Sequence, residues 1–155
     1  MTSTITAATM TVTLTESISL SGVDQGATNT LSIGSIAEVN KRILTVPTSE
    51  VEVIAFGTAV SSGTFVESTA MYIRFTNLDD TNHIVLIFKD EANAEFAVKL
   101  DKGQSFIYNG DLSGGVVDTM DALNGPVTPT LADLVNVTAK ADTASCDLEV
   151  FVAST

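Results

Sequence analysis

The chain of 155 residues contains no tryptophan, only one cysteine and only one histidine. With Cys146 alone, no internal disulfide can form and no cysteine cluster is available for zinc, and we expect this residue to be buried on a strand. His83 gives little support for catalysis, since a nucleophile needs a base beside it, and we interpret it as a residue of a loop or strand end. The sequence therefore predicts no enzyme, no catalytic or cofactor-binding residues and no cofactor.

Positive charge is also scarce: 7 lysines and arginines stand against 19 acidic residues, so the formal net charge is −12. Such a surface repels phosphate backbones and anionic headgroups, and we expect neither a nucleic-acid nor a membrane partner. Residues 1–9 contain no basic residue and no apolar stretch of signal-peptide length, and no later segment is apolar enough to span a bilayer. The sequence thus predicts synthesis in a cytoplasm.

Motifs for phosphate and calcium binding are incomplete. The glycine-rich segment Gly110–Gly115 lacks the lysine and the following helix of a phosphate loop. Acidic pairs occur at Asp79–Asp80, at Asp90–Glu91, and at Asp118 with Asp121. None lies in a loop with the alternating oxygen ligands and terminal glutamate that calcium requires. We interpret these pairs as solvated turn residues and predict no metal site.

Hydrophobicity with a period of two is the strongest positive signal, and it is typical of strands with one buried face. Runs of this kind include Met10–Leu20, Met71–Thr76 and Cys146–Val152. In the first run, Glu16 interrupts the apolar side, which indicates two short strands or a bulge. A length of 155 residues fits one domain, so we predict a single domain, residues 1–155, with about nine or ten strands. The expected fold class is all-β, an antiparallel two-sheet β-sandwich of jelly-roll type.

Turn residues predict how neighbouring strands are connected. Three hairpins are expected, and they join residues 43–46 with 51–56, residues 84–88 with 96–100, and residues 135–139 with 146–152. A turn at 101–104 would add residues 105–108 as the third strand of an antiparallel meander. Helical spacing predicts a short helix at Ser35–Arg42, and one helical turn could begin at Thr130–Leu134.

Two irregular segments stand apart from these strands. Residues 1–9 form an expected N-terminal arm, and residues 109–130 form a long loop rich in glycine and proline. The backbone groups of such segments find few partners inside a sandwich, so we expect both at the surface, free to order on binding. Tyr72 and Tyr108 are expected on the outer face of strands, where they could contact a sugar or a protein.

The segment Tyr72–Asn82, the strand Phe96–Leu100 and the turn Asp101–Phe106 resemble small virion structural proteins of tailed bacteriophages, especially marine and cyanobacterial ones. In those proteins a strand ending in asparagine leads to a hairpin and a glycine-containing turn. The likeness covers roughly Met71–Tyr108, with a looser match at Cys146–Val152. It implies a virion protein, specifically a capsid decoration or cement protein that stabilises the head through contacts with the major capsid protein. It carries over no catalytic residue.

Two alternative functions stay open: a tail, neck or fibre-associated protein of the same virion, and a host-glycan-binding module. The resemblance and the symmetry of capsids also imply a homo-oligomer, with a trimer as the simplest form. A symmetric binder can engage several capsid subunits at once, so that individually weak contacts add up.

Overall fold

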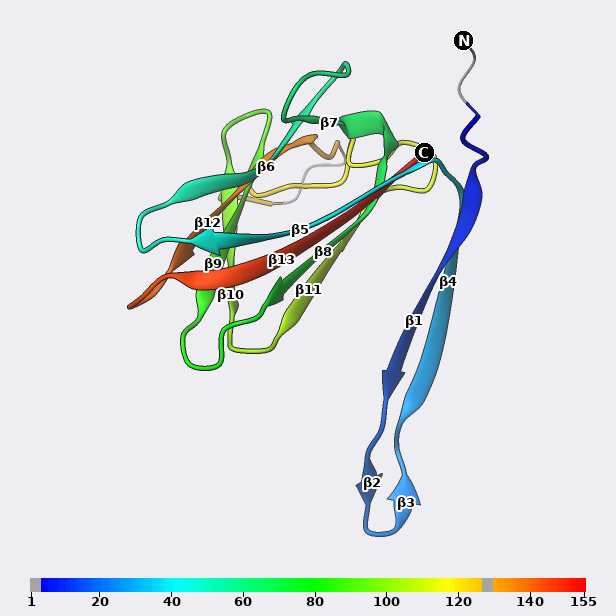
Figure 1. Cartoon of the computed structure of the whole chain (residues 1–155), viewed down its shortest axis with the longest axis vertical. Helices are drawn as coiled ribbons and strands as arrows, with labels where there is room; N and C mark the ends of the chain where they lie inside the picture. The colour runs from blue at the N-terminus through cyan, green and yellow to red at the C-terminus, as the bar shows by residue number, and fades with distance from the viewer. Residues whose placement is uncertain (1–3, 127–129) are drawn as a thin grey trace.

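The computed structural model describes residues 4–126 and 130–155, and it is almost entirely β-structured (Figure 1). The body consists of β5 (Glu38–Val46), β6 (Val51–Gly57), β7 (Phe65–Val66), β8 (Ala70–Asn77), β9 (Ile84–Asp90), β10 (Glu95–Leu100), β11 (Ser105–Asn109), β12 (Leu134–Ala141) and β13 (Cys146–Ser154). A 3₁₀ turn, η1 (Glu67–Thr69), precedes β8. Outside the body stand β1 (Ala8–Glu16), β2 (Ser19–Leu20), β3 (Val23–Asp24) and β4 (Ala27–Ile36).

The body is a two-sheet sandwich. Sheet I has the strand order β11-β8-β13-β5, and sheet II has the order β10-β9-β12-β6-β7. Apart from the short β7, these eight strands follow the order of a jelly roll, because the chain crosses from one sheet to the other at every connection except that between β9 and β10. The predicted antiparallel jelly-roll sandwich is confirmed. The sandwich has nine strands, within the predicted nine or ten, and the described residues form four further strands outside it.

The core lies between the two sheets and is centred on Phe88 of β9. This side chain is fully buried, and the centroid of its ring lies 4.8–5.8 Å from the ring centroids of Phe75, Phe96, Phe106 and Tyr108. Inward side chains come from alternate positions of the strands, as the period of two requires. Burial of each large apolar side chain contributes about 1.5–3 kcal/mol, so this cluster is a main source of stability.

Two of the three expected hairpins are wrong. β5 and β6, and likewise β12 and β13, follow one another in the chain but lie in opposite sheets. Only β9 and β10 form the predicted hairpin, with Phe96 opposite Phe88. The meander is wrong as well, because β11 pairs with β8 of sheet I instead of continuing from β10. A turn signal marks where the chain reverses, but it does not distinguish a paired hairpin from a bend that crosses between sheets.

Both helical predictions are also wrong. Residues 35–42 belong to β4 and β5, joined through Ala37, and β5 pairs along its whole length with β13. The apolar spacing there reflects the outer face of a strand, on which Val39 and Ile43 are 55% and 60% exposed. Near residue 130, Ala132 forms a bridge with Met120 instead of starting a helical turn. Pairing with distant strands outweighs local helical preference in both places.

The long loop is not the free surface segment that composition predicted. Val116 and Met120 are buried in the main core, and the Val116 N–H donates to the Glu67 carbonyl at 2.8 Å. The Tyr108 hydroxyl lies 2.8 Å from Thr119 Oγ1. Many backbone groups of the loop therefore do find partners, and the surface expectation is wrong for Gly115, Val116 and Met120, whereas residues 111–113 are exposed as expected. Residues 127–129 of the predicted loop lie outside the described residues.

Candidate functional site: the β-arm and the open edge of the sandwich

The projecting part of the molecule is a long β-hairpin, residues 8–36, which we call the β-arm. β1 pairs antiparallel with β4, and β2 pairs with β3 at the tip. Ser21 and Gly22 make the tip turn with φ angles of 52° and 81°, the left-handed conformation that suits a two-residue hairpin turn. In Figure 1 the β-arm leaves the body beside the last residues of β13 and points away from it. Of the predicted N-terminal arm, residues 4–7 are exposed and belong to no strand, Ala8 and Thr9 begin β1, and residues 1–3 lie outside the described residues.

The β-arm has two chemically different faces. One carries the apolar pairs Met10–Ile33 and Val12–Leu31, continued by Leu14 opposite Asn29. The other carries the hydroxyl pairs Thr11–Ser32, Thr13–Thr30 and Thr15–Thr28, and in the last pair the two hydroxyl oxygens lie 3.3 Å apart. The alternation that the sequence showed is therefore real, but it produces an amphipathic ribbon rather than a sandwich strand.

The base of the β-arm is anchored on the outer face of sheet I. Ile33 and Ile36 are buried there against Met71, Tyr72 and Ala153, with Met10, Val12 and Leu31 packed at the margin. The Tyr72 ring also meets the Phe151 ring edge-on at 6.0 Å. These contacts fix the direction in which the arm leaves the body.

The distal half of the β-arm has no such cover within the described residues. Leu14 is 51% exposed, Ile18 49%, Leu20 59% and Val23 57%. A two-stranded ribbon in water is only marginally stable by itself, and exposed apolar side chains grouped on one element mark an interaction surface. The distal β-arm is therefore the strongest candidate for a functional surface.

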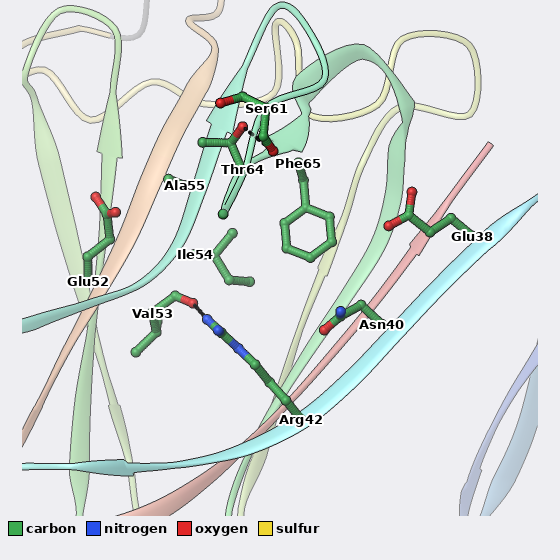
Figure 2. A pocket seen from close by; sticks show the side chains of 11 residues that line it. Glu38, Asn40, Arg42, Glu52, Val53, Ile54, Ala55, Ser61, Thr64 and Phe65 are labelled. Atoms are coloured by element: carbon green, nitrogen blue, oxygen red, sulfur yellow. Dashed lines mark hydrogen bonds between the residues drawn. The ribbon is translucent and has the colours of Figure 1, made fainter.

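A second feature is a groove of about 450 Å³ along the side of the sandwich (Figure 2). Glu38, Asn40 and Arg42, at alternate positions of β5, line one wall, and residues 52–55 of β6 with residues 61–65 line the other. Arg42 reaches across and donates a hydrogen bond to the Val53 carbonyl. The groove exists because β5 and β6 belong to different sheets and diverge here.

β5 borders this groove as the last strand of sheet I. It pairs with β13 on one side, and no strand among the described residues pairs with its other side. Its outer face carries Val39 and Ile43, both more than half exposed, with Lys41 between them at 58% side-chain exposure. An edge of this length leaves backbone N–H and C=O groups available to another strand.

Cys146 and His83, the single cysteine and histidine, make contacts that support the fold. Cys146 is 1% exposed, which confirms its predicted burial, and this burial raises the pKa of the thiol. His83 lies at the turn before β9, with Nδ1 3.5 Å from Asp142 Oδ2, and its carbonyl accepts the Asp142 N–H at 3.1 Å. These contacts join the β8–β9 connection to the β12–β13 connection.

The tyrosines are not outward-facing contact residues. Tyr108 stacks on Phe88 in the core, and Tyr72 is 5% exposed beneath the base of the β-arm. The expectation that they stand free on the outer face is wrong, because Tyr108 faces the core between the sheets and the base of the β-arm covers Tyr72. Neither ring offers the exposed stacking surface that the glycan-binding alternative needs.

The acidic pairs shape turns. Asp90 is 3% exposed and accepts the N–H groups of Ala92 and Ala94 at 2.9 and 2.7 Å. Asp79 accepts those of Thr81 and Asn82 at 2.8 and 2.6 Å. Within residues 4–126 and 130–155, no group of three or more His, Cys, Asp or Glu side chains is placed to hold a metal ion.

The Asp79 turn leads to a pH-dependent prediction. Hydrogen bonds from the Asn82 and Thr81 N–H groups lower the pKa of the Asp79 carboxyl. Its folded-state pKa lies below its unfolded value, so the carboxylate stabilises the fold above its ordinary pKa, and this contribution is lost as the pH falls through the folded-state value.

We expect Asp79→Ala to lower the free energy of unfolding at pH 7, and the difference from the native chain to shrink below about pH 4. Urea unfolding across this range measures it. Asp80→Ala is the control, since that carboxylate bonds only the Thr81 hydroxyl, and a pH-independent loss in Asp79→Ala would contradict the assignment.

Sequence reasoning missed both the β-arm and the groove. A signal for the first was present: Ser21–Gly22 stands between two long alternating segments, which is typical of a hairpin turn. No local signal marks the groove, because it depends on which strands end up at the edges of the two sheets.

Comparison with known proteins gives limited information. No family model and no curated protein matches the chain. A solved structure of Bacillus endospore appendages, described as a novel family of disulfide-linked pili, is similar over 97% of this chain and 90% of its own, with 8% sequence identity and a TM-score of 0.40. A similarity of this size says nothing about function. In the described part of the chain, no helix has the length and apolar character that crossing a membrane requires.

Proposed function

We propose that the protein is a non-catalytic structural protein that works through protein–protein contacts, as a capsid decoration or cement protein of a tailed bacteriophage. One observation carries the proposal: the distal β-arm extends beyond the body and exposes Leu14, Ile18, Leu20 and Val23. Apolar side chains that are half exposed and grouped on one element mark an interaction surface, and burying them against another molecule would favour association.

The construction of the body supports this role. The packed jelly-roll core and the buried base of the β-arm hold the arm in a defined direction, so little conformational freedom is lost when it binds. At nine residues, β1 is about 30 Å long, which lets the arm span a neighbouring subunit. A rigid body with a projecting apolar ribbon suits assembly.

The virion location rests on the sequence resemblance of Met71–Tyr108. The strong negative charge adds a constraint on the receiving surface, because a chain with a net charge of −12 associates best with a basic face. The proposed partner is the major capsid protein, and the proposed location is the virion, after synthesis in the host cytoplasm. A homo-oligomer, with a trimer as its simplest form, would match repeated sites on the head.

Removing the distal β-arm is expected to abolish capsid binding. In the test variant, residues 13–30 are replaced by Asn-Gly, which joins the facing residues Val12 and Leu31 through a two-residue turn and keeps the anchored base. We expect the native protein to co-sediment with decoration-free capsids of its phage and the variant to bind at least about ten-fold more weakly, with little change in melting temperature.

The matched control is Ser21→Asp, which adds charge at the tip turn without altering the apolar face, and it should bind like the native chain. Equal binding by the arm-trimmed variant would overturn the role of the arm. Native protein that binds isolated tails but not capsids would assign it to the tail instead.

A further inference from the structure

We propose that the distal β-arm of one copy docks on the open edge of β5 in a second copy, extending sheet I by a strand and covering the groove. This inference rests on the proposed function, since it names one partner of the same arm. Addition of a strand to an exposed sheet edge is a common mode of recognition, in which backbone hydrogen bonds supply affinity and alternate side chains supply specificity.

The two elements match face for face. A strand added beside β5 must place one face next to Glu38, Asn40 and Arg42 in the groove, and the other next to Val39, Lys41 and Ile43 on the outer surface. The β-arm alternates in the same way, with hydroxyl side chains on one face and apolar ones on the other. A shift of one residue would place the apolar face of the arm in the polar groove and its hydroxyl face on the apolar outer surface. Only registers that keep like faces together are therefore compatible.

One antiparallel register matches the five positions from Leu14 to Ile18. Placing Leu14 opposite Ile43 brings Glu16 opposite Lys41 and Ile18 opposite Val39. The residues between them then face the groove, with Thr15 beside Arg42 and Ser17 beside Asn40. Glu16, which interrupts the apolar run of the arm, thus meets Lys41, which interrupts the apolar face of β5 and already lies 3.3 Å from Glu149 Oε2. The hydroxyl groups meet the polar groove wall.

The receiving edge must belong to another copy. β4 leads into β5 through Ala37 alone, and the β-arm points away from the body at this junction (Figure 1). Its buried base contacts on Tyr72 and Met71 hold it there. The tip therefore cannot fold back onto the β5 edge of its own chain.

Docking in both directions enlarges the contact. Each docked arm buries the exposed halves of its apolar side chains, their counterparts on β5 and a row of backbone groups. Exchange around a two-fold axis, or passage around a ring, gives every subunit two such contacts, and a specific interface needs roughly 1,000 Å² in total.

Disulfide trapping tests the register directly. Chains carrying Ile18→Cys are mixed with chains carrying Val39→Cys under mild oxidation, and we expect a covalent dimer that contains one of each, since directly opposed residues have Cβ atoms about 4.5–5.5 Å apart. The matched control replaces Ile18→Cys with Ser17→Cys, which is one residue out of register and faces the groove. It should give little product. Cys146 is buried and does not compete.

Charge reversal gives a second readout in the otherwise native chain. Glu16→Lys and Lys41→Glu should each weaken self-association several-fold in sedimentation equilibrium, and a mixture of the two single variants should restore part of it, as for an exposed ion pair. Leu78→Lys, at an exposed position away from both surfaces, should have no effect.

The outcomes separate the two proposals. A native chain that stays monomeric and forms no Ile18–Val39 disulfide overturns the docking inference, and so does equal trapping by Ser17→Cys. If the arm-trimmed variant still loses capsid binding in that case, the proposed function stands and the arm acts only on the capsid. If the copies dock as proposed but bind no virion part, the inference holds and the virion role fails.

Discussion

Phe88→Ala is expected to destabilise the protein by about 3–5 kcal/mol, the range for truncating a fully buried phenylalanine. The side chain has 0% exposure and contacts four other aromatic rings from both sheets, so its loss leaves a cavity that the surrounding strands cannot close. Equilibrium unfolding in urea measures the change.

Phe151→Ala is the matched control, because Phe151 lies on the outer face of sheet I beside Tyr72 and is only partly buried. We expect a clearly smaller loss there. Equal losses for the two variants would mean that the centre of the core is not at Phe88.

Gly115→Ala is expected to cost more than about 2 kcal/mol, for two independent reasons. Gly115 has a φ of 63°, which side-chain-bearing residues rarely adopt, and an added Cβ would lie 2.2 Å from the Glu67 carbonyl oxygen. The contact is with backbone on both sides, so neither partner can rotate away. The loop would have to leave the core surface.

Two other glycines separate these causes. Gly103 has a φ of 71° but open space around its Cβ position, so Gly103→Ala should show the conformational cost alone, about 1 kcal/mol. A Cβ added at Gly114 would lie 3.7 Å from its nearest neighbour, Asp111 Oδ2, and the φ of Gly114 is ordinary. Gly114→Ala should therefore leave the free energy of unfolding nearly unchanged. Any other order of the three losses would contradict the packing of the long loop.

The sequence predicted the fold class because alternation depends only on neighbouring residues. Residues 71–76 and 146–152 alternate because one face of their strands packs in the main core, as Ile73 and Phe75 do, and those strands were found. Pairing depends on distant residues. Nothing in residues 43–56 indicates that β5 pairs with β13 while β6 pairs with β12, so the expected hairpin failed there.

The candidate site was harder to predict for a related reason. Leu14 and Leu20 have the same pattern as core residues, and only their place on a hairpin outside the sandwich makes them exposed. Conversely, glycine-rich composition suggested an exposed loop at residues 110–120, but Val116 and Met120 within it are buried in the core. Pattern identifies which side chains require burial, whereas the tertiary structure decides which of them obtain it within one chain.

The strand order also has a consequence for synthesis on the ribosome. β13 lies between β8 and β5 in sheet I, although it follows both in the chain, and β5 pairs with nothing else among the described residues. In the nascent chain, β5 therefore cannot join β8 in sheet I until β13 has emerged. Pairing of β13 with β5 joins residues about a hundred positions apart, and contacts between such distant residues form slowly. The β-arm is a local hairpin that can form much earlier. Until β13 has emerged, the apolar face of the β-arm is therefore exposed to solvent, because the body that anchors the base of the arm is not yet complete.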